Sequence, residues 1–290
     1  MCQGDAGSHR ECGRKIIVMI LVDTHVHIHR CFDIGIFLTS AAFNFRSAAA
    51  ASCPEQPCQA VLCLTEDAGS SEFERLRNLA SGHSSLNGWS ISRTGERHSL
   101  VASHQEQGAL TILAGRQIRC EEGIEVLALG TCRLYDDGIT ANTAIDQIHG
   151  EGALAVVAWG FGKWTGRRGR VVRRILENRT VEEISLGDNS GRLAFWPEPG
   201  EFALSRRRGF RILPGSDPLP FSSEVKRVAS YGLAVPGDLS STEPARALIG
   251  MLSDSAVQTR PFGQLETPLR FLRNQLAMQL VKRQMEMSLV

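Results

Sequence analysis

Hydrophobic positions along the chain follow two alternating patterns, which are short continuous apolar runs and longer segments with a helical period. The apolar runs have the length of buried strands and lie at residues 16–22, 60–65, 109–115, 124–130, 153–159, 181–187, 210–217 and 228–235. Helical periods lie at residues 33–45, 71–80, 140–149, 167–178, 244–252 and 267–287. Short strands that alternate with helices predict an α/β fold with mainly parallel strands. Seven or eight such units in one chain favour a barrel over an open sheet.

The first apolar run continues into residues 21–29, LVDTHVHIH. In a strand, successive side chains point to opposite faces, so Asp23, His25, His27 and His29 share one face. Four potential ligands on one face are more than a soluble strand usually needs. The alternation therefore predicts a strand whose polar side carries His25 and His27 at the edge of a site, with Asp23 available to orient a histidine.

Polar or charged residues follow nearly every other predicted strand. In an α/β barrel the active site lies at the carboxyl ends of the strands, so these positions are expected to meet. In chain order they are Glu66-Asp67, Arg116-Gln117, Trp159 followed by Lys163 and Arg167, Asp188-Asn189, and Ser216-Asp217. Their recurrence at strand end after strand end indicates a site more strongly than any single motif does.

Imidazole and carboxylate ligands together suit zinc, manganese or iron. Two such ions can clamp the attacking and leaving oxygens of a phosphoester. Positively charged side chains near the same strand ends can hold an anionic group, and an arginine fork suits phosphate or carboxylate. Other interpretations stay open: Lys163 and Arg167 also fit a solvated basic surface, Trp164 fits ordinary packing, and Asp188-Asn189 fits a plain turn.

Composition narrows the choice of partners. With 32 basic and 31 acidic residues the formal net charge is +1, which argues against a mainly electrostatic nucleic-acid binder. RNA binding through the basic segment 166–174 is therefore disfavoured. The run at 16–22 is far shorter than the roughly 20 residues of a membrane span and has no cleavage pattern behind it, so it is interpreted as a strand. Eight cysteines without a C-x-x-C pair favour reduced thiols and a cytoplasmic protein.

Several segments together carry a family resemblance. In order they are D-T-H-V-H at 23–27, T-E-D at 65–67, G-R-Q-I at 115–118, A-I-D-Q-I-H-G-E-G-A-L-A-V-V-A-W at 144–159 and P-G-S-D at 214–217. Over residues 20–235 the chain resembles the PHP family, the polymerase and histidinol phosphatase domains. The resemblance implies a distorted (β/α)7 barrel, up to nine His, Asp and Glu ligands for two or three metal ions, and phosphoester hydrolysis. Amidohydrolase barrels also open with H-x-H, but the later histidines of this chain do not fall at strand ends.

The chain departs from the PHP pattern at several ligand positions. Where the resemblance implies histidine, it has Asp67, Glu125, Trp159 and Leu219. Tryptophan and leucine cannot bind a metal, so the resemblance implies a reduced site with one or two divalent ions, zinc, manganese or iron. The ligands expected for this site are His25, His27, Asp217, Glu66 and Asp67.

The resulting hypothesis is a metal-dependent hydrolase, a phosphoesterase that acts on a small anionic substrate, with no nucleic-acid or membrane partner. The residues expected to act on the substrate are Lys163, Arg167 and Asp188 as catalytic groups, and Arg116, Gln117, Trp164 and Asn189 as binding groups. The alternative is a catalytically inactive barrel that binds a ligand or partner. We expect a flexible extension at 1–18, the barrel at 19–240, and C-terminal helices packed on it at 241–290. The oligomeric state, the substrate and the choice between Met1 and Met19 as start stay open.

Overall fold

The computed structural model describes residues 17–80 and 86–287, so most of the predicted N-terminal extension lies outside the described residues. Within this range the strands form two sheets. The seven-stranded sheet has the order β12 (Arg260–Gly263), β11 (Tyr231–Pro236), β1 (Met19–Val26), β2 (Cys58–Leu64), β5 (Gly108–Leu113), β4 (Ser99–His104) and β3 (Ser90–Arg93). The five-stranded sheet has the order β10 (Ile212–Gly215), β9 (Ile184–Asn189), β8 (Leu154–Ala158), β7 (Glu125–Leu129) and β6 (Gly115–Arg119).

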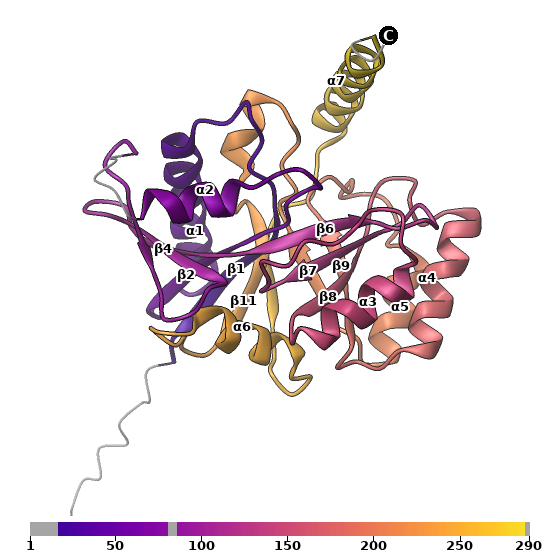
Figure 1. The fold of residues 1–290 in the computed structure, drawn as a ribbon, viewed down its shortest axis with the longest axis horizontal. Coiled ribbons are helices and arrows are strands. Elements are labelled where there is room, and N and C mark those ends of the chain that lie inside the picture. The colour runs from indigo at the N-terminus through magenta and orange to yellow at the C-terminus, as the bar shows by residue number, and fades with distance from the viewer. Residues whose placement is uncertain (1–16, 81–85, 288–290) are drawn as a thin grey trace, which may run out of the picture.

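Helices cover the outer faces of the two sheets (Figure 1). On the seven-stranded sheet lie α1 (Ile34–Ser52) and α2 (Glu72–Leu79). Beside the five-stranded sheet lie α3 (Ala141–Gly150), α4 (Gly166–Asn178) and α5 (Gly200–Arg207). The remaining helices are the 3₁₀ helix η1 (Ser222–Arg227), α6 (Pro244–Ser253) and α7 (Pro268–Met287), of which α7 extends away from the body.

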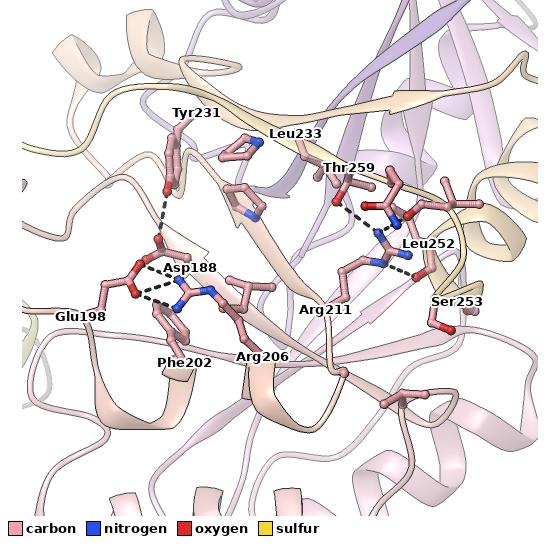
Figure 2. Close-up of a pocket in the computed structure, with 18 of the residues that line it drawn as sticks. Asp188, Glu198, Phe202, Arg206, Arg211, Tyr231, Leu233, Leu252, Ser253 and Thr259 are labelled. Atoms are coloured by element: carbon pink, nitrogen blue, oxygen red, sulfur yellow. Dashed lines mark hydrogen bonds and ion pairs between the residues drawn. The ribbon is translucent and has the colours of Figure 1, made fainter. Parts of the chain in front are cut away.

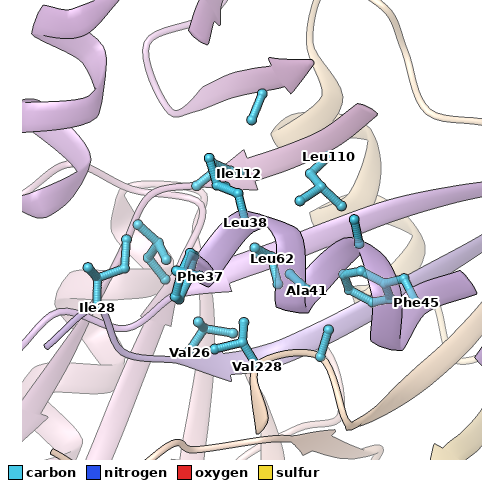
Figure 3. Close-up of a cluster of buried hydrophobic side chains, with 14 of the residues drawn as sticks. Val26, Ile28, Phe37, Leu38, Ala41, Phe45, Leu62, Leu110, Ile112 and Val228 are labelled. Atoms are coloured by element: carbon cyan, nitrogen blue, oxygen red, sulfur yellow. The ribbon is translucent and has the colours of Figure 1, made fainter. Parts of the chain in front are cut away.

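Helix α1 packs one side against the seven-stranded sheet, as its hydrophobic pattern predicts. It begins at a cap that the sequence contains, because the Asp33 carboxylate accepts the backbone N–H of Ile36 at 2.9 Å. Its inner side buries Phe37 and Phe45 against strand residues such as Leu62 (Figure 3). Each fully buried side chain of this size contributes about 1.5–3 kcal/mol relative to exposure. The outward residues of the same helix, Ile36 and Phe43, are exposed.

The two sheets enclose a shared apolar interior. Val22 of β1, Val156 of β8 and Leu213 of β10 belong to one buried cluster, although β1 lies in one sheet and the other two strands in the other. Leu248 and Leu252 of α6 join the same cluster and close one end of it. The other end of the strands carries the polar residues considered below.

The α/β class is confirmed, but the described strands lie in two sheets rather than in one closed barrel. The sheets adjoin where Asp217 donates its backbone N–H to His25 at 2.8 Å, and where Gln117 donates its own to Glu66 at 2.9 Å. The expectation of mainly parallel strands is wrong, because six of the ten pairings among the described strands are antiparallel. The short connections within β3–β4–β5 and β6–β7 permit only hairpins, since a parallel pair needs a long crossover.

Helix α7 does not use its leucine stripe for packing. Leu269, Leu272 and Leu276 are 60–82% exposed, whereas Phe271 and Asn274 on the same helix are buried. These three leucines therefore lie outside the core. The predicted division of the chain at residue 240 stays a prediction. In the part of the chain that the structure describes, no helix is both long and apolar enough to cross a membrane.

Candidate metal centre

Three of the predicted ligands lie together at the carboxyl end of β1. The imidazole Nε2 atoms of His25 and His27 are 3.1 Å apart. The Asp217 Oδ1 atom lies 3.6 Å from the first and 3.5 Å from the second. Over residues 17–80 and 86–287, this is the one group of three His, Cys, Asp or Glu side chains close enough to hold a metal ion. The alternation in the sequence thus placed the two histidines on one face correctly.

The two histidines lie at the end of β1 in one sheet, and Asp217 follows β10 in the other. The backbone determines how closely these two segments approach each other. Gly215 of β10 packs directly on β1, because a Cβ at this position would lie 2.5 Å from the backbone nitrogen of His25. Two residues later the chain turns through Asp217, whose φ of 44° is uncommon for a residue other than glycine. The close approach of β10 to β1 and the turn at Asp217 together place the Asp217 carboxylate beside the two histidines.

Asp23 stabilises this junction between β1 and the segment after β10 through hydrogen bonds. Its buried carboxylate accepts hydrogen bonds from the backbone N–H groups of Ser216 and Ala229, both at 2.8 Å, and from the Ser216 hydroxyl. It also accepts the backbone N–H of His25 at 3.3 Å. Burial raises the pKa of Asp23 to about 6, even though these four hydrogen bonds favour the ionised form. Asp23 therefore positions His25 through its backbone N–H rather than through its imidazole.

The electrostatics of the group suit metal binding. Burial, followed by the neighbouring His25, lowers the pKa of His27 to about 4, so this imidazole is neutral at neutral pH. Burial opposes ionisation of Asp217, but His25, His27 and Lys163 outweigh it and hold the pKa of Asp217 below its ordinary value. A neutral imidazole and an ionised carboxylate are the forms that bind a metal.

The distances fit a small divalent ion. Tetrahedral ligands about 2.1 Å from zinc are separated from one another by about 3.4 Å. The three separations of 3.1, 3.5 and 3.6 Å lie around this value. Three protein ligands leave one position for water or substrate, as in catalytic rather than structural zinc sites. The residues present therefore fit one divalent ion.

The acidic residues after β2 lie outside this group. Glu66 pairs with Arg116 at 2.8 Å and accepts the backbone N–H of Phe73 at 2.6 Å. Asp67 accepts a hydrogen bond from the Gln117 amide at 3.1 Å, and the Gln117 Oε1 atom lies 3.2 Å from His25 Nε2. The structure thus joins Asp67 to the centre through Gln117, while Glu66 and Arg116 neutralise each other nearby.

A cleft of about 150 Å³ opens beside Asp217. Its lining includes Trp159, Lys163, Asn189 and Leu219. The Asn189 amide donates to Asp217 Oδ2 at 2.9 Å, and Lys163 forms an ion pair with Glu125. Two of the four positions at which the resemblance implies histidine, Trp159 and Leu219, therefore line this cleft with apolar side chains.

The cleft also contains a basic residue that the sequence interpretation missed. Arg227, from the end of η1, lines it and pairs with Glu266. In the sequence Arg227 follows a lysine in a polar segment, which looks like ordinary surface. Only the fold brings it to the cleft. By contrast, Arg167 is exposed on α4 and does not line the cleft.

Two further predicted site residues lie elsewhere. The Asp188 carboxylate makes two hydrogen bonds to buried Arg192, at 3.0 and 2.8 Å, and accepts the Tyr231 hydroxyl at 2.9 Å. Trp164 is buried, donates its indole N–H to the Ala158 carbonyl at 3.0 Å, and contacts Phe202 edge to face. The structure does not bring either residue to the three ligands.

The fold is similar to that of PsfC from Pseudomonas syringae PB-5123, at 16% identity over 92% of this chain and 98% of that one, with a TM-score of 0.53. Two further similar structures are of Endonuclease Q. The lesion-specific enzyme from Pyrococcus furiosus matches at 11% identity over 84% of this chain and 59% of its own, with a TM-score of 0.49. A complex with a 27-mer duplex substrate matches at 10% over 80% and 56%, with a TM-score of 0.46. No family model and no curated protein matches the sequence.

PsfC and Endonuclease Q are PHP-like proteins, and at these identities the similarity shows an α/β fold and assigns no family. They also correct one expectation. Endonuclease Q binds a nucleic-acid duplex, which contradicts the exclusion of a nucleic-acid partner drawn from net charge. Net charge averages over the whole surface, whereas a nucleic acid responds to local charge, such as the exposed arginines of α4.

Proposed function

We propose that the protein is a metal-dependent hydrolase that cleaves a phosphoester. The observation that carries the proposal is the convergence of His25, His27 and Asp217 on one point at the side of a cleft that contains Lys163 and Arg227. The fold similarity is compatible with this function. The proposal needs one metal ion and does not need a closed barrel.

One set of residues would hold the metal ion, and another would bind the substrate. A bound divalent ion lowers the pKa of a water molecule towards about 7 and polarises a phosphoryl oxygen. Gln117 and Asn189 fix the ligands His25 and Asp217 through the contacts described above. Lys163, whose side chain is 35% exposed, is placed to attract the phosphoryl group into the cleft.

The cleft accommodates a phosphoryl group and little more, so the rest of the substrate extends towards solvent. We therefore propose an anionic substrate with an accessible phosphoester, for which p-nitrophenyl phosphate is a suitable first probe. Hydrolysis of this monoester, of its diester bis(p-nitrophenyl) phosphate and of a single-stranded oligonucleotide would distinguish a small-molecule enzyme from a nuclease.

The test is metal content and hydrolysis measured on the same purified protein. We expect about one zinc, manganese or iron ion per chain by elemental analysis, and metal-dependent release of p-nitrophenol. The substitution His27→Ala should remove both, whereas His149→Ala, at an exposed histidine of α3, should change neither. Absence of a bound transition metal after loading with each of the three ions would overturn the proposal.

A second candidate is a non-catalytic binding protein, favoured by the apolar Trp159 and Leu219 in the cleft. In this case the protein binds an anion such as inorganic phosphate without hydrolysing an ester. Phosphate binding that persists in His27→Ala and disappears in Lys163→Ala would favour this candidate over the enzyme.

A further inference from the structure

A second cavity, of about 470 Å³, lies apart from the metal centre. Strand β9 separates the two, because Asn189 lines the metal-site cleft while its neighbour Asp188 lines this cavity. Consecutive residues of a strand point to opposite faces, so the two sites lie on opposite sides of β9. Other walls come from α5, from β11 and from the loop that follows α6. Its volume falls in the range of small-molecule sites, about 300–1,000 Å³.

Most charges of the cavity are paired within it (Figure 2). At one side, Asp188 is neutralised by Arg192. Beside them, Arg206 makes hydrogen bonds of 2.7 and 2.8 Å to Glu198. In each pair two arginine nitrogens bind both oxygens of the carboxylate, so neither pair carries a net charge. The third arginine, Arg211, lies at the opposite side.

Arg211 has a different set of partners. Its guanidinium donates to the carbonyl oxygens of Leu252, Asp254 and Val257, at 3.0, 2.6 and 3.0 Å, and to the Thr259 hydroxyl at 3.1 Å. Within the described part of the chain, no carboxylate lies within ion-pair distance of it. Burial lowers the pKa of this guanidinium, against the opposing effect of the Asp254 charge. The cavity therefore carries one positive charge that its own lining does not neutralise.

The rest of the lining combines polar and apolar side chains. The apolar side chains that keep exposed surface there include those of Ile212, Val257 and Pro261. An inorganic ion would leave this apolar surface without a partner, whereas a neutral apolar molecule would leave the arginine charge uncompensated.

We propose that this cavity binds a small organic monoanion, with its charged group beside Arg211 and its apolar body against Ile212 and Pro261. The proposal does not depend on the metal centre or on the hydrolase function. A ligand with two or more negative charges would bring carboxylates of the lining, Asp188 and Glu198, into repulsion.

A matched pair of fluorescent probes tests the proposal. 8-Anilinonaphthalene-1-sulfonate carries one negative charge, and N-phenyl-1-naphthylamine has the same apolar body without that charge. We expect the anion to bind with one-to-one stoichiometry and at least ten-fold more tightly than the neutral probe, and octanoate to displace it. Equal affinities for the two probes would overturn the proposal.

Two variants locate the bound probe. Arg211→Gln should abolish the preference for the anion, while Arg208→Gln, at an exposed arginine that does not line the cavity, should leave it intact. Ser253→Trp should fill the cavity with Arg211 still present and remove binding of both probes. If Arg211→Gln fails to fold by circular dichroism, Ser253→Trp decides. Anion binding that survives Ser253→Trp would place the probe elsewhere, for example on the exposed leucines of α7, and would contradict the proposal.

Discussion

At the scale of single residues, Gly215 determines whether the metal ligands can meet. A methyl group there would overlap the backbone nitrogen of His25, and backbone cannot rotate away as a flexible side chain can. We expect Gly215→Ala to lower the free energy of unfolding by about 1–3 kcal/mol, as overpacking usually does. We also expect a loss of metal affinity of about ten-fold or more, because supporting contacts of a metal site typically have effects of this size.

The measurements are denaturant unfolding and titration with zinc. Gly150→Ala is the matched control, because a Cβ at Gly150 would meet no atom within 4 Å and the residue ends a helix in an ordinary conformation. This control should be neutral or should stabilise the protein by about 0.4–1 kcal/mol. Equal effects of the two substitutions would show that the close approach of β10 to β1 does not matter.

The residue scale also shows what the sequence could predict about the site. Strand alternation placed His25 and His27 on one face, since that depends on local geometry alone. The recurrence of polar residues at strand ends added Asp217, and the family resemblance implied that it is a ligand. The contact of Gln117 with His25 and the position of Arg227 in the cleft depend on segments about 90 and 200 residues away from β1, so no local pattern reports them.

At the scale of elements, a buried ion network attaches α7 to the body. Arg227 pairs with Glu266 just before α7, and Arg270 in the first turn of α7 pairs with Glu224 of η1 at 3.1 Å. Glu224 and Glu266 are 1% and 4% exposed. Removing one carboxylate from such a network leaves a buried arginine with less compensation, which is strongly destabilising.

We therefore expect Glu266→Gln to lower the free energy of unfolding by about 3 kcal/mol and to speed amide hydrogen exchange in α7. The control is Glu243→Gln, which breaks a pair with Arg246 whose side chains are 50% and 80% exposed and should change stability by less than about 1 kcal/mol. If the two variants were equally stable, the network would not attach α7.

Elements were easier to predict than their pairing. The helix predicted at 33–45 and the strand predicted at 60–65 agree with α1 and β2. The run at 109–115, however, is not one strand, because β5 ends at Leu113 and β6 begins at Gly115 in the other sheet. Gly115 permits this crossing, since a Cβ there would lie 2.5 Å from the Ala128 carbonyl oxygen. Apolar patterning does not say where a chain changes sheets.

At the scale of the whole molecule, the metal centre lies across the junction of the two sheets. His25 lies in β1 of the seven-stranded sheet and His27 directly follows that strand, whereas Asp217 is the second residue after β10 of the five-stranded sheet. An ion bound by all three ligands would connect the two sheets at the end opposite α6. The shared apolar core, which includes residues of α6, connects them at the other end. Metal binding should therefore stabilise the entire fold rather than a single loop.

A ligand that binds only the folded chain stabilises it by about 2.7 kcal/mol at a free concentration one hundred times its Kd. For a chain of this size, this corresponds to an increase of about 5 °C in the unfolding midpoint. We expect zinc or manganese to produce such an increase in the metal-free protein, and a chelator to reverse it. Asp217→Asn and His27→Ala should each abolish it, because each removes a ligand from one of the two sheets. An increase that persists in both variants would show that the stabilising ion binds elsewhere, whereas an increase lost only with His27→Ala would mean that the ion does not bridge the sheets.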